Sequence, residues 1–129
     1  MDSKNEHYNE LLKALLPEEI FTYFEIVKVE VQHKSLNVHL DELNEPPSAY
    51  KDSKLISKGF YPAISIQDFP VRERAVFLQV RRRKWQVESS GEIVSNTWDT
   101  VATGTRYTKG FASFLKEVLG HLPDQQQKP

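Results

Sequence analysis

The sequence contains no cysteine, which excludes disulfides, thiolate catalysis, iron–sulfur clusters and any cysteine-ligated zinc site. It has only five glycines, which leave little room for a glycine-rich loop that cradles phosphate. It has no apolar run of about 18 residues that would span a membrane. The polar, acidic start, Met1 to Glu6, has no signal-peptide core. These absences predict a cytoplasmic protein with no membrane contact.

What is present is enough for one folded domain. The chain has 129 residues, 39% of them hydrophobic, and 14 aromatic side chains (7 Phe, 5 Tyr and 2 Trp) that can build a core. The net charge of -1 hides a split. Residues 1–50 carry 4 basic and 10 acidic side chains, net -6, and residues 51–129 carry 13 basic and 8 acidic ones, net +5. Such asymmetry raises the question of a polyanionic partner.

The first half combines helical and strand patterns. Apolar residues from Tyr8 to Leu16 recur at helical spacing, and Pro17 with Glu18 and Glu19 begins a second short helix that includes Ile20 to Phe24. From Ile26 the period is two as far as Asp41, which predicts a β-hairpin turning at Lys34-Ser35. Residues 43–59, rich in Pro, Ser and Asn, predict a long loop.

The second half predicts a second hairpin region and a helix. Residues 60–69 alternate, 70–73 turn, and 75–85 form a long strand that returns through Ser89-Ser90-Gly91 to Ile93 and Val94. Trp98 and Val101 are expected to extend the sheet, and Thr108 is expected to cap a helix over Lys109–Leu119.

The sum is an α+β fold in which antiparallel hairpins form a small sheet flanked by short N-terminal helices and a C-terminal helix. We expect one domain over residues 10–122, with a helical and hairpin part at 10–45 and a ribbon-like part at 58–122. A frayed segment at 1–9 and a disordered tail at 123–129 bound this domain.

The most distinctive feature is a basic cluster: Arg72 to Lys84 holds six cations and one acid. On a strand, Val76, Leu78 and Val80 share one face, and the other face carries Phe77, Gln79, Arg81, Arg83 and Trp85. Arginine forks suit phosphate, and aromatic rings support stacking. The alternative is a solvated strand paired with acids such as Glu88 and Glu92. Trp85 is expected to pack in the core.

No constellation of catalytic or metal-binding residues emerges. Asp41, Glu42 and Glu45 are interpreted as a solvated acidic turn. His33 and His39 flank the hairpin turn, where two ligands would not complete a structural zinc site. We therefore expect no catalytic residues, no metal, no cofactor and no small-molecule substrate.

Three stretches carry a family resemblance: Ser65 to Arg72, with its Asp68-Phe69-Pro70 motif, Ala75 to Trp85, and Thr103 to Thr108 leading into Phe111. They resemble the N-terminal zinc-ribbon region of bacterial insertion-sequence transposases. The whole chain looks like a cysteine-free branch in which this region is a separate short protein beside the catalytic one. The cysteine pairs of the zinc-binding members are missing here, which implies that an aromatic core replaces the metal. That core would use Phe60, Phe69, Phe77, Trp85, Trp98, Tyr107, Phe111 and Phe114.

The resemblance implies a non-catalytic accessory region of a transposase, in a bacterial cytoplasm and at the nucleoid when bound to DNA. Its expected partners are the terminal inverted repeats of a mobile element and the catalytic transposase subunit. The candidate nucleic-acid-binding residues are Arg72, Arg74, Arg81, Arg82, Arg83, Lys84, Arg106 and Lys109. The alternative is an assembly module that docks on the catalytic subunit through its acidic helices, with the arginines only solvating an edge strand.

Overall fold

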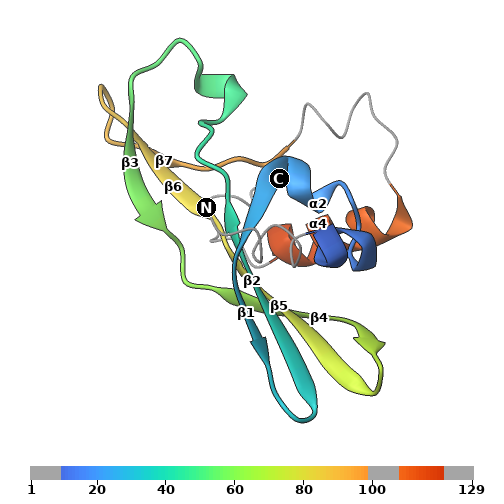
Figure 1. The fold of residues 1–129 in the computed structure, drawn as a ribbon. Coiled ribbons are helices and arrows are strands. Elements are labelled where there is room, and N and C mark those ends of the chain that lie inside the picture. The colour runs from blue at the N-terminus through green and yellow to red at the C-terminus, as the bar shows by residue number, and fades with distance from the viewer. Residues whose placement is uncertain (1–9, 99–107, 121–129) are drawn as a thin grey trace.

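Two hairpins and the helices that cover them make up the fold of the computed structural model, which describes residues 10–98 and 108–120 (Figure 1). The α+β class is confirmed. Residues 10–15 are helical and are followed by α2. From there the described elements are two helices, a 3-10 turn and seven strands, in the order α2 (Ile20–Tyr23), β1 (Phe24–Val31), β2 (Ser35–Glu42), η1 (Ser48–Tyr50), β3 (Leu55–Phe60), β4 (Ile64–Val71), β5 (Arg74–Arg81), β6 (Arg83–Val87), β7 (Ile93–Val94) and α4 (Lys109–Gly120).

The first sheet joins the two halves of the chain. Its strand order is β1-β2-β5-β4, and both hairpins, β1–β2 and β4–β5, are antiparallel as expected. The inner strands β2 and β5 run parallel, with Val38 opposite Leu78 and Leu40 opposite Val80. The sequence did not predict this pairing. Because of it, the segments 10–45 and 58–122 share one sheet and one core, within the described residues.

The second hairpin is longer than expected and bends. Strands β3 and β6 continue the β4–β5 ribbon into a second sheet of order β3-β6-β7. The predicted loop over 43–59 is therefore too long, since β3 begins at Leu55. The predicted turn over 70–73 shrinks to Arg72 and Glu73, whose φ values of 51° and 70° match a two-residue hairpin turn. Pro70 is accommodated in β4 because this is an edge strand, where a missing N–H costs little.

The main core lies between the four-stranded sheet and the helices. Val38, Leu40, Val76, Leu78 and Val80 point inward, as the alternation on β5 predicted. The helices contribute a matching set of buried side chains: Leu12, Leu16, Ile20, Phe111, Phe114, Leu115 and Val118. In Figure 1 the helices lie against one end of this sheet, and the hairpin tips extend beyond them.

Aromatic rings strengthen this core, although not all the expected ones do. Phe24 packs edge-on against Phe114 at 5.5 Å between ring centroids, and Trp98 lies 5.7 Å from Phe24. Phe69, expected inside, is 80% exposed, because it alternates with Ile64 and Ile66, whose side chains face the core from β4. Trp85 is buried as predicted, in a second small cluster with Val87 and Val94. Tyr107 lies outside the described residues.

The start of α4 agrees with the sequence prediction. The Phe111 N–H donates to the Thr108 hydroxyl at 3.2 Å, which is the expected N-cap contact. Glu19, just before α2, accepts hydrogen bonds from the Thr108 N–H at 2.9 Å and from its hydroxyl at 3.0 Å. This contact fastens the N-terminal helices to α4 and lowers the pKa of Glu19.

The predicted features around β7 and at the chain ends have different outcomes. The turn before β7 is present, with Gly91 at a φ of 79° that other residues rarely adopt. Trp98 does not extend the sheet, because it lies after β7 with a φ of 57°. Val101 and the segments 1–9 and 123–129 fall outside the described residues. Across the two described ranges, no helix has the length and apolarity to cross a bilayer.

Candidate nucleic-acid interface

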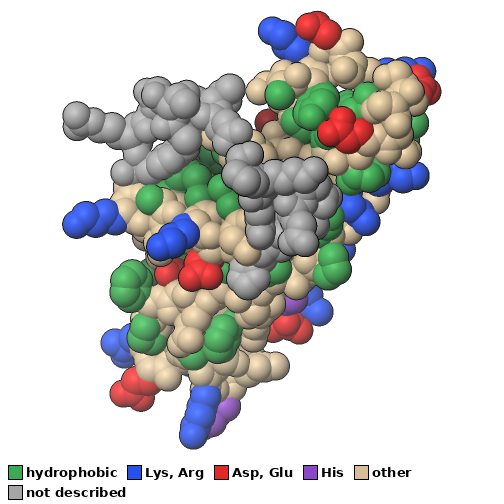
Figure 2. Space-filling model, turned by 180° about the vertical axis from the view of Figure 1, so that it is seen from behind, with side chains coloured by type: hydrophobic (Ala, Val, Ile, Leu, Met, Phe, Trp, Pro, Cys, Tyr) green, Lys and Arg blue, Asp and Glu red, His purple; other side chains and the backbone are tan. Residues whose placement is uncertain are grey.

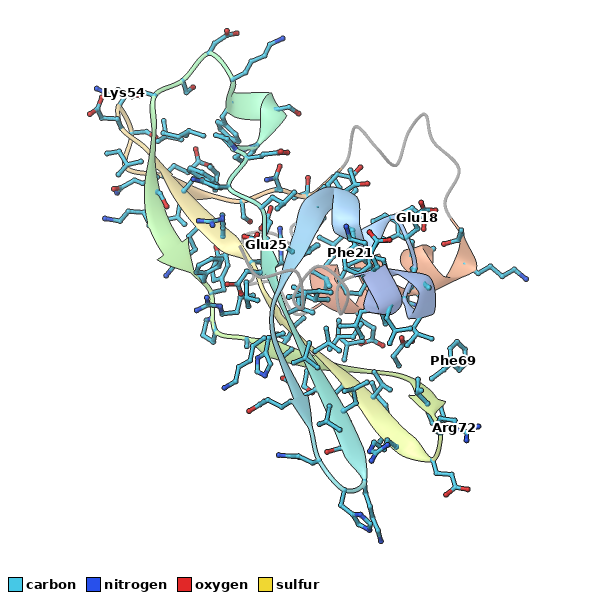
Figure 3. The ribbon with its side chains drawn as sticks, in the orientation of Figure 1. Glu18, Phe21, Glu25, Lys54, Phe69 and Arg72 are labelled. Carbon is cyan, nitrogen blue, oxygen red and sulfur yellow. The ribbon has the colours of Figure 1, made fainter. Side chains whose placement is uncertain are left out.

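The predicted basic residues do not form one continuous surface. Arg72 occupies the exposed β4–β5 turn (Figure 3), and Lys109 is exposed at the start of α4. Arg106 lies outside the described residues. On the face shown in Figure 2, Lys and Arg side chains are scattered and several adjoin acidic ones. The candidate site therefore narrows to the four consecutive cations from Arg81 to Lys84.

Arg81 and Arg83 share one aromatic support. Both lie on the same side of the β5–β6 strand, and their guanidinium carbons lie 4.1 Å and 4.6 Å from the centre of the Phe60 ring. Phe60 ends β3, where it pairs with Arg83 across the ribbon. Cation–π contact of this kind limits the rotation of both guanidinium groups. We call Arg81 and Arg83, together with the ring that supports them, the Phe60 arginine pair.

Asp41 fixes Arg81 further. The two residues are neighbours in the β2–β5 register, and Arg81 donates to both carboxylate oxygens of Asp41, from Nε at 2.8 Å and from Nη2 at 2.6 Å. The hydrogen bond to Asp41 raises the pKa of Arg81. The Arg81 side chain is still 45% exposed. Asp41 thus orients Arg81 and also neutralises part of its charge.

Arg83 is oriented without a carboxylate. Its Nε donates to the backbone carbonyl of Glu42 at 2.9 Å, and its backbone N–H donates to the Glu42 carboxylate at 2.8 Å. Among the described residues, no hydrogen bond engages its two terminal nitrogens. Lys84 lies over the Tyr61 ring, with Nζ 5.4 Å from the ring centre. Arg83 therefore presents a positioned fork with free donors.

Arg82 is not a surface residue, contrary to the prediction. It lies between β5 and β6 and is 3% exposed, with its guanidinium carbon 4.9 Å from the centre of the Trp98 ring. Within residues 10–98 and 108–120, none of its three side-chain nitrogens has a hydrogen-bond partner. Burial lowers its pKa, while the nearby Glu42 charge opposes that shift. Arg82 is buried because the long ribbon bends at this point, where one sheet gives way to the next.

Glu42 is the polar core residue that sequence reasoning missed. The sequence places it with Asp41 and Glu45 in a solvated turn, but only Glu45 is exposed there: Asp41 is 8% exposed, and Glu42 is 2% exposed and continues the inward face of Val38 and Leu40. Its second carboxylate oxygen accepts a hydrogen bond from the Asn96 side chain at 2.9 Å. Burial raises the pKa of Glu42 despite these contacts. The even-numbered alternation along β2 was the signal that could have placed it inside.

Arg74 has a structural contact rather than an exposed fork. Its Nε donates to the Gln32 carbonyl at 3.0 Å, and the Ala75 N–H donates to the Lys34 carbonyl at 3.0 Å. These bonds join the tips of the two hairpins. The first hairpin turns at His33 and Lys34, one residue earlier than predicted, since Gln32 bonds to Ser35 across the turn.

The histidines and carboxylates do not meet as metal ligands. His39 contacts Glu30 at 2.7 Å on the outer face of the sheet, and Lys28 lies 3.4 Å from the same carboxylate. His33 is exposed at the hairpin turn. Within residues 10–98 and 108–120, no group of three or more His, Asp or Glu side chains is arranged to hold a metal ion.

Comparison with protein-family models, curated proteins and solved structures finds no match to this chain.

Proposed function

We propose that the chain is a non-catalytic accessory region of an insertion-sequence transposase and that it binds the DNA of the element's ends. The observation that supports DNA binding is the Phe60 arginine pair. Two guanidinium groups two residues apart on one strand face are held on a single ring, at 4.1 Å and 4.6 Å from its centre. Positioned guanidinium groups suit phosphate because less side-chain entropy is lost when each contact forms.

The donors that remain free favour Arg83 as the principal phosphate contact. Arg83 uses only Nε and its backbone N–H within the described fold, which leaves both terminal nitrogens for a phosphate oxygen. Arg81 has already committed Nε and Nη2 to Asp41. Its contribution to DNA binding is therefore smaller than that of Arg83.

The accessory role rests on the sequence resemblance, in which a separate chain carries the catalytic residues. The structure bears on the alternative role of the arginines. The strands that carry them, β5 and β6, lie in the middle of their sheets and not at an edge. The arginines therefore do not solvate an edge strand, as the assembly alternative assumed.

The test is titration of a labelled duplex carrying a terminal inverted repeat with the wild-type protein and with single variants. We expect Arg83→Gln to weaken binding about tenfold and to reduce the slope of log affinity against log salt by about one. Lys116→Gln, which removes the same charge from the exposed face of α4, is the matched control. Equal effects of the two substitutions, or no salt-dependent binding by the wild type, would reject this function.

A second role, assembly with the catalytic subunit, is favoured by Phe69. This side chain belongs to the Asp68-Phe69-Pro70 motif and is 80% exposed on the edge strand β4. An exposed aromatic ring on a sheet edge offers a large apolar surface that a bound partner protein buries. Co-purification with the catalytic subunit should be lost in Phe69→Ser and retained in Ile56→Ser, an exposed apolar control on β3. Retention in both variants counts against this role.

A further inference from the structure

The strand β1 has a free edge that carries exposed valines. It is the first strand of the order β1-β2-β5-β4, and no strand among the described residues pairs with its other side. Val27, Val29 and Val31 on this strand are 51%, 38% and 63% exposed. An eight-residue edge strand with apolar side chains is a template for pairing with another strand. Such an edge needs a partner or a protective device.

The backbone groups of Val29 and Val31 face this free edge. The Gln32 N–H donates to the Ser35 carbonyl across the hairpin turn, so the backbone of Gln32 faces β2. In an antiparallel pair, the side to which the backbone N–H and C=O groups point alternates with each residue. The backbone groups of Glu30 therefore also face β2, and the backbone groups of Val29 and Val31 face outward. A new strand would find its hydrogen-bonding groups at these two valines.

The sequence of β1 is complementary to itself around Val29. Placing a second copy antiparallel, with Val29 opposite Val29 of the second copy, sets Lys28 opposite Glu30 and Glu30 opposite Lys28. The same register sets Val31 opposite Val27, the residue at the irregularity between Ile26 and Lys28, and brings these exposed apolar side chains next to one another. Lys28 and Glu30 carry exposed side chains, at 62% and 38%. Opposite charges directly across a strand pair stabilise it.

We propose that the protein forms a two-fold symmetric dimer through antiparallel β1–β1 pairing centred on Val29, which joins two four-stranded sheets into one of eight strands. The occupant is a second copy of this chain because Lys28-Val29-Glu30 is complementary in charge to its own reversed sequence. A two-fold interface requires this self-complementarity. The dimer is independent of DNA binding and of any transposase partner.

The absence of cysteine makes the register directly testable. In an antiparallel pair, opposite Cα atoms lie about 4.5–5.5 Å apart, which is within the range for a disulfide. Val29→Cys should therefore cross-link to its own copy under mild oxidation. Val31→Cys is the matched control: it is more exposed, but it lies about 13 Å from Val31 of the second copy in this register. Only the first variant should form a covalent dimer.

Charge reversal tests the same pairing without oxidation. Sedimentation of the wild type over a wide concentration range should show a species of twice the 15.0 kDa chain mass. Lys28→Glu should raise the dissociation constant about tenfold, because symmetry creates two like-charge pairs. Lys28→Glu with Glu30→Lys should restore it, while circular dichroism confirms that each variant folds. A monomer at all concentrations, failure of the double variant to restore the dimer, or equal cross-linking of both cysteine variants would overturn the proposal.

Discussion

Arg81 and Asp41 are neighbours in two parallel strands, and their side chains form a two-pronged ion pair with N–O distances of 2.8 Å and 2.6 Å. The pair joins the first hairpin to the second on the outer face of the sheet. The same aspartate that positions Arg81 on the Phe60 ring also competes with any phosphate for its donors. Asp41 therefore limits the affinity of the proposed DNA-binding face.

Removing that competition should strengthen DNA binding. Asp41→Asn abolishes one negative charge and releases the Arg81 guanidinium, while the side-chain shape is kept. We expect the affinity for duplex DNA to rise severalfold and its salt dependence to steepen, at a cost of about 1 kcal/mol or less in the free energy of unfolding. Fluorescence anisotropy at several salt concentrations measures the first effect and urea denaturation the second. Unchanged or weaker binding would show that Arg81 does not contact phosphate.

The buried charges of Arg82 and Glu42 should depend on one another. Arg82→Met alone leaves the Glu42 carboxylate without its nearest buried cation and should lower the free energy of unfolding by about 3 kcal/mol. Adding Glu42→Gln removes that unbalanced charge, so the double variant should recover most of the loss. Urea denaturation of the wild type, both single variants and the double variant completes the cycle. Simple additivity of the two single effects would contradict this coupling.

Glu42 should also give stability a distinct pH dependence. Burial raises its pKa, so the unfolded chain releases this proton near the ordinary value of 4.5, whereas the folded protein holds it to higher pH. The contribution of Glu42 is therefore most favourable below pH 4.5 and is lost as the pH rises through the folded pKa. As the pH increases from 4.5 to the folded pKa of Glu42, the free energy of unfolding of the wild type should fall progressively relative to that of Glu42→Gln. A pH-independent difference between the two proteins would refute this prediction.

The cap at the start of α4 should stabilise the contact between the helices. Thr108→Ala removes the hydroxyl that accepts the Phe111 N–H and donates to Glu19. We expect a loss of about 1–2 kcal/mol in the free energy of unfolding, as for other N-cap threonines. Thr108→Ser keeps the hydroxyl and should remain close to the wild type. Thermal unfolding, monitored by circular dichroism, compares the three proteins. Equal melting temperatures would show that the cap does not stabilise the fold.

Local patterns in the sequence predicted most of the elements. The period-two alternation of Val76, Leu78 and Val80 predicted the core face of β5, and Thr108 predicted the start of α4. These signals are reliable because they depend on neighbours within a few residues. Three predictions were wrong: that Phe69 is a core residue, that Trp98 extends the sheet, and that Glu42 lies in a solvated turn, although Trp98 does pack in the core as expected. The alternation along β2 and β4 carried a local signal for Glu42 and Phe69, whereas the positive φ of Trp98 has no signal in the local pattern.

The candidate site was only partly visible in the sequence. The alternation correctly placed Arg81 and Arg83 on one face, but nothing in it showed that Phe60 would support both or that Asp41 would pair with Arg81. Those partners come from strands separated from the arginines by about 20 to 40 residues.

The sequence by itself determined that this chain lacks cysteine chemistry, places helices at both ends of two hairpin regions and concentrates its arginines in one segment, because composition and local periodicity are properties of the chain alone. The tertiary structure decided that β2 pairs parallel with β5 and that the ribbon bends at Arg82. These two features depend on which distant strands pair with each other. They bury Arg82, pair Arg81 with a carboxylate, and leave Arg83 with two terminal nitrogens that no described residue engages.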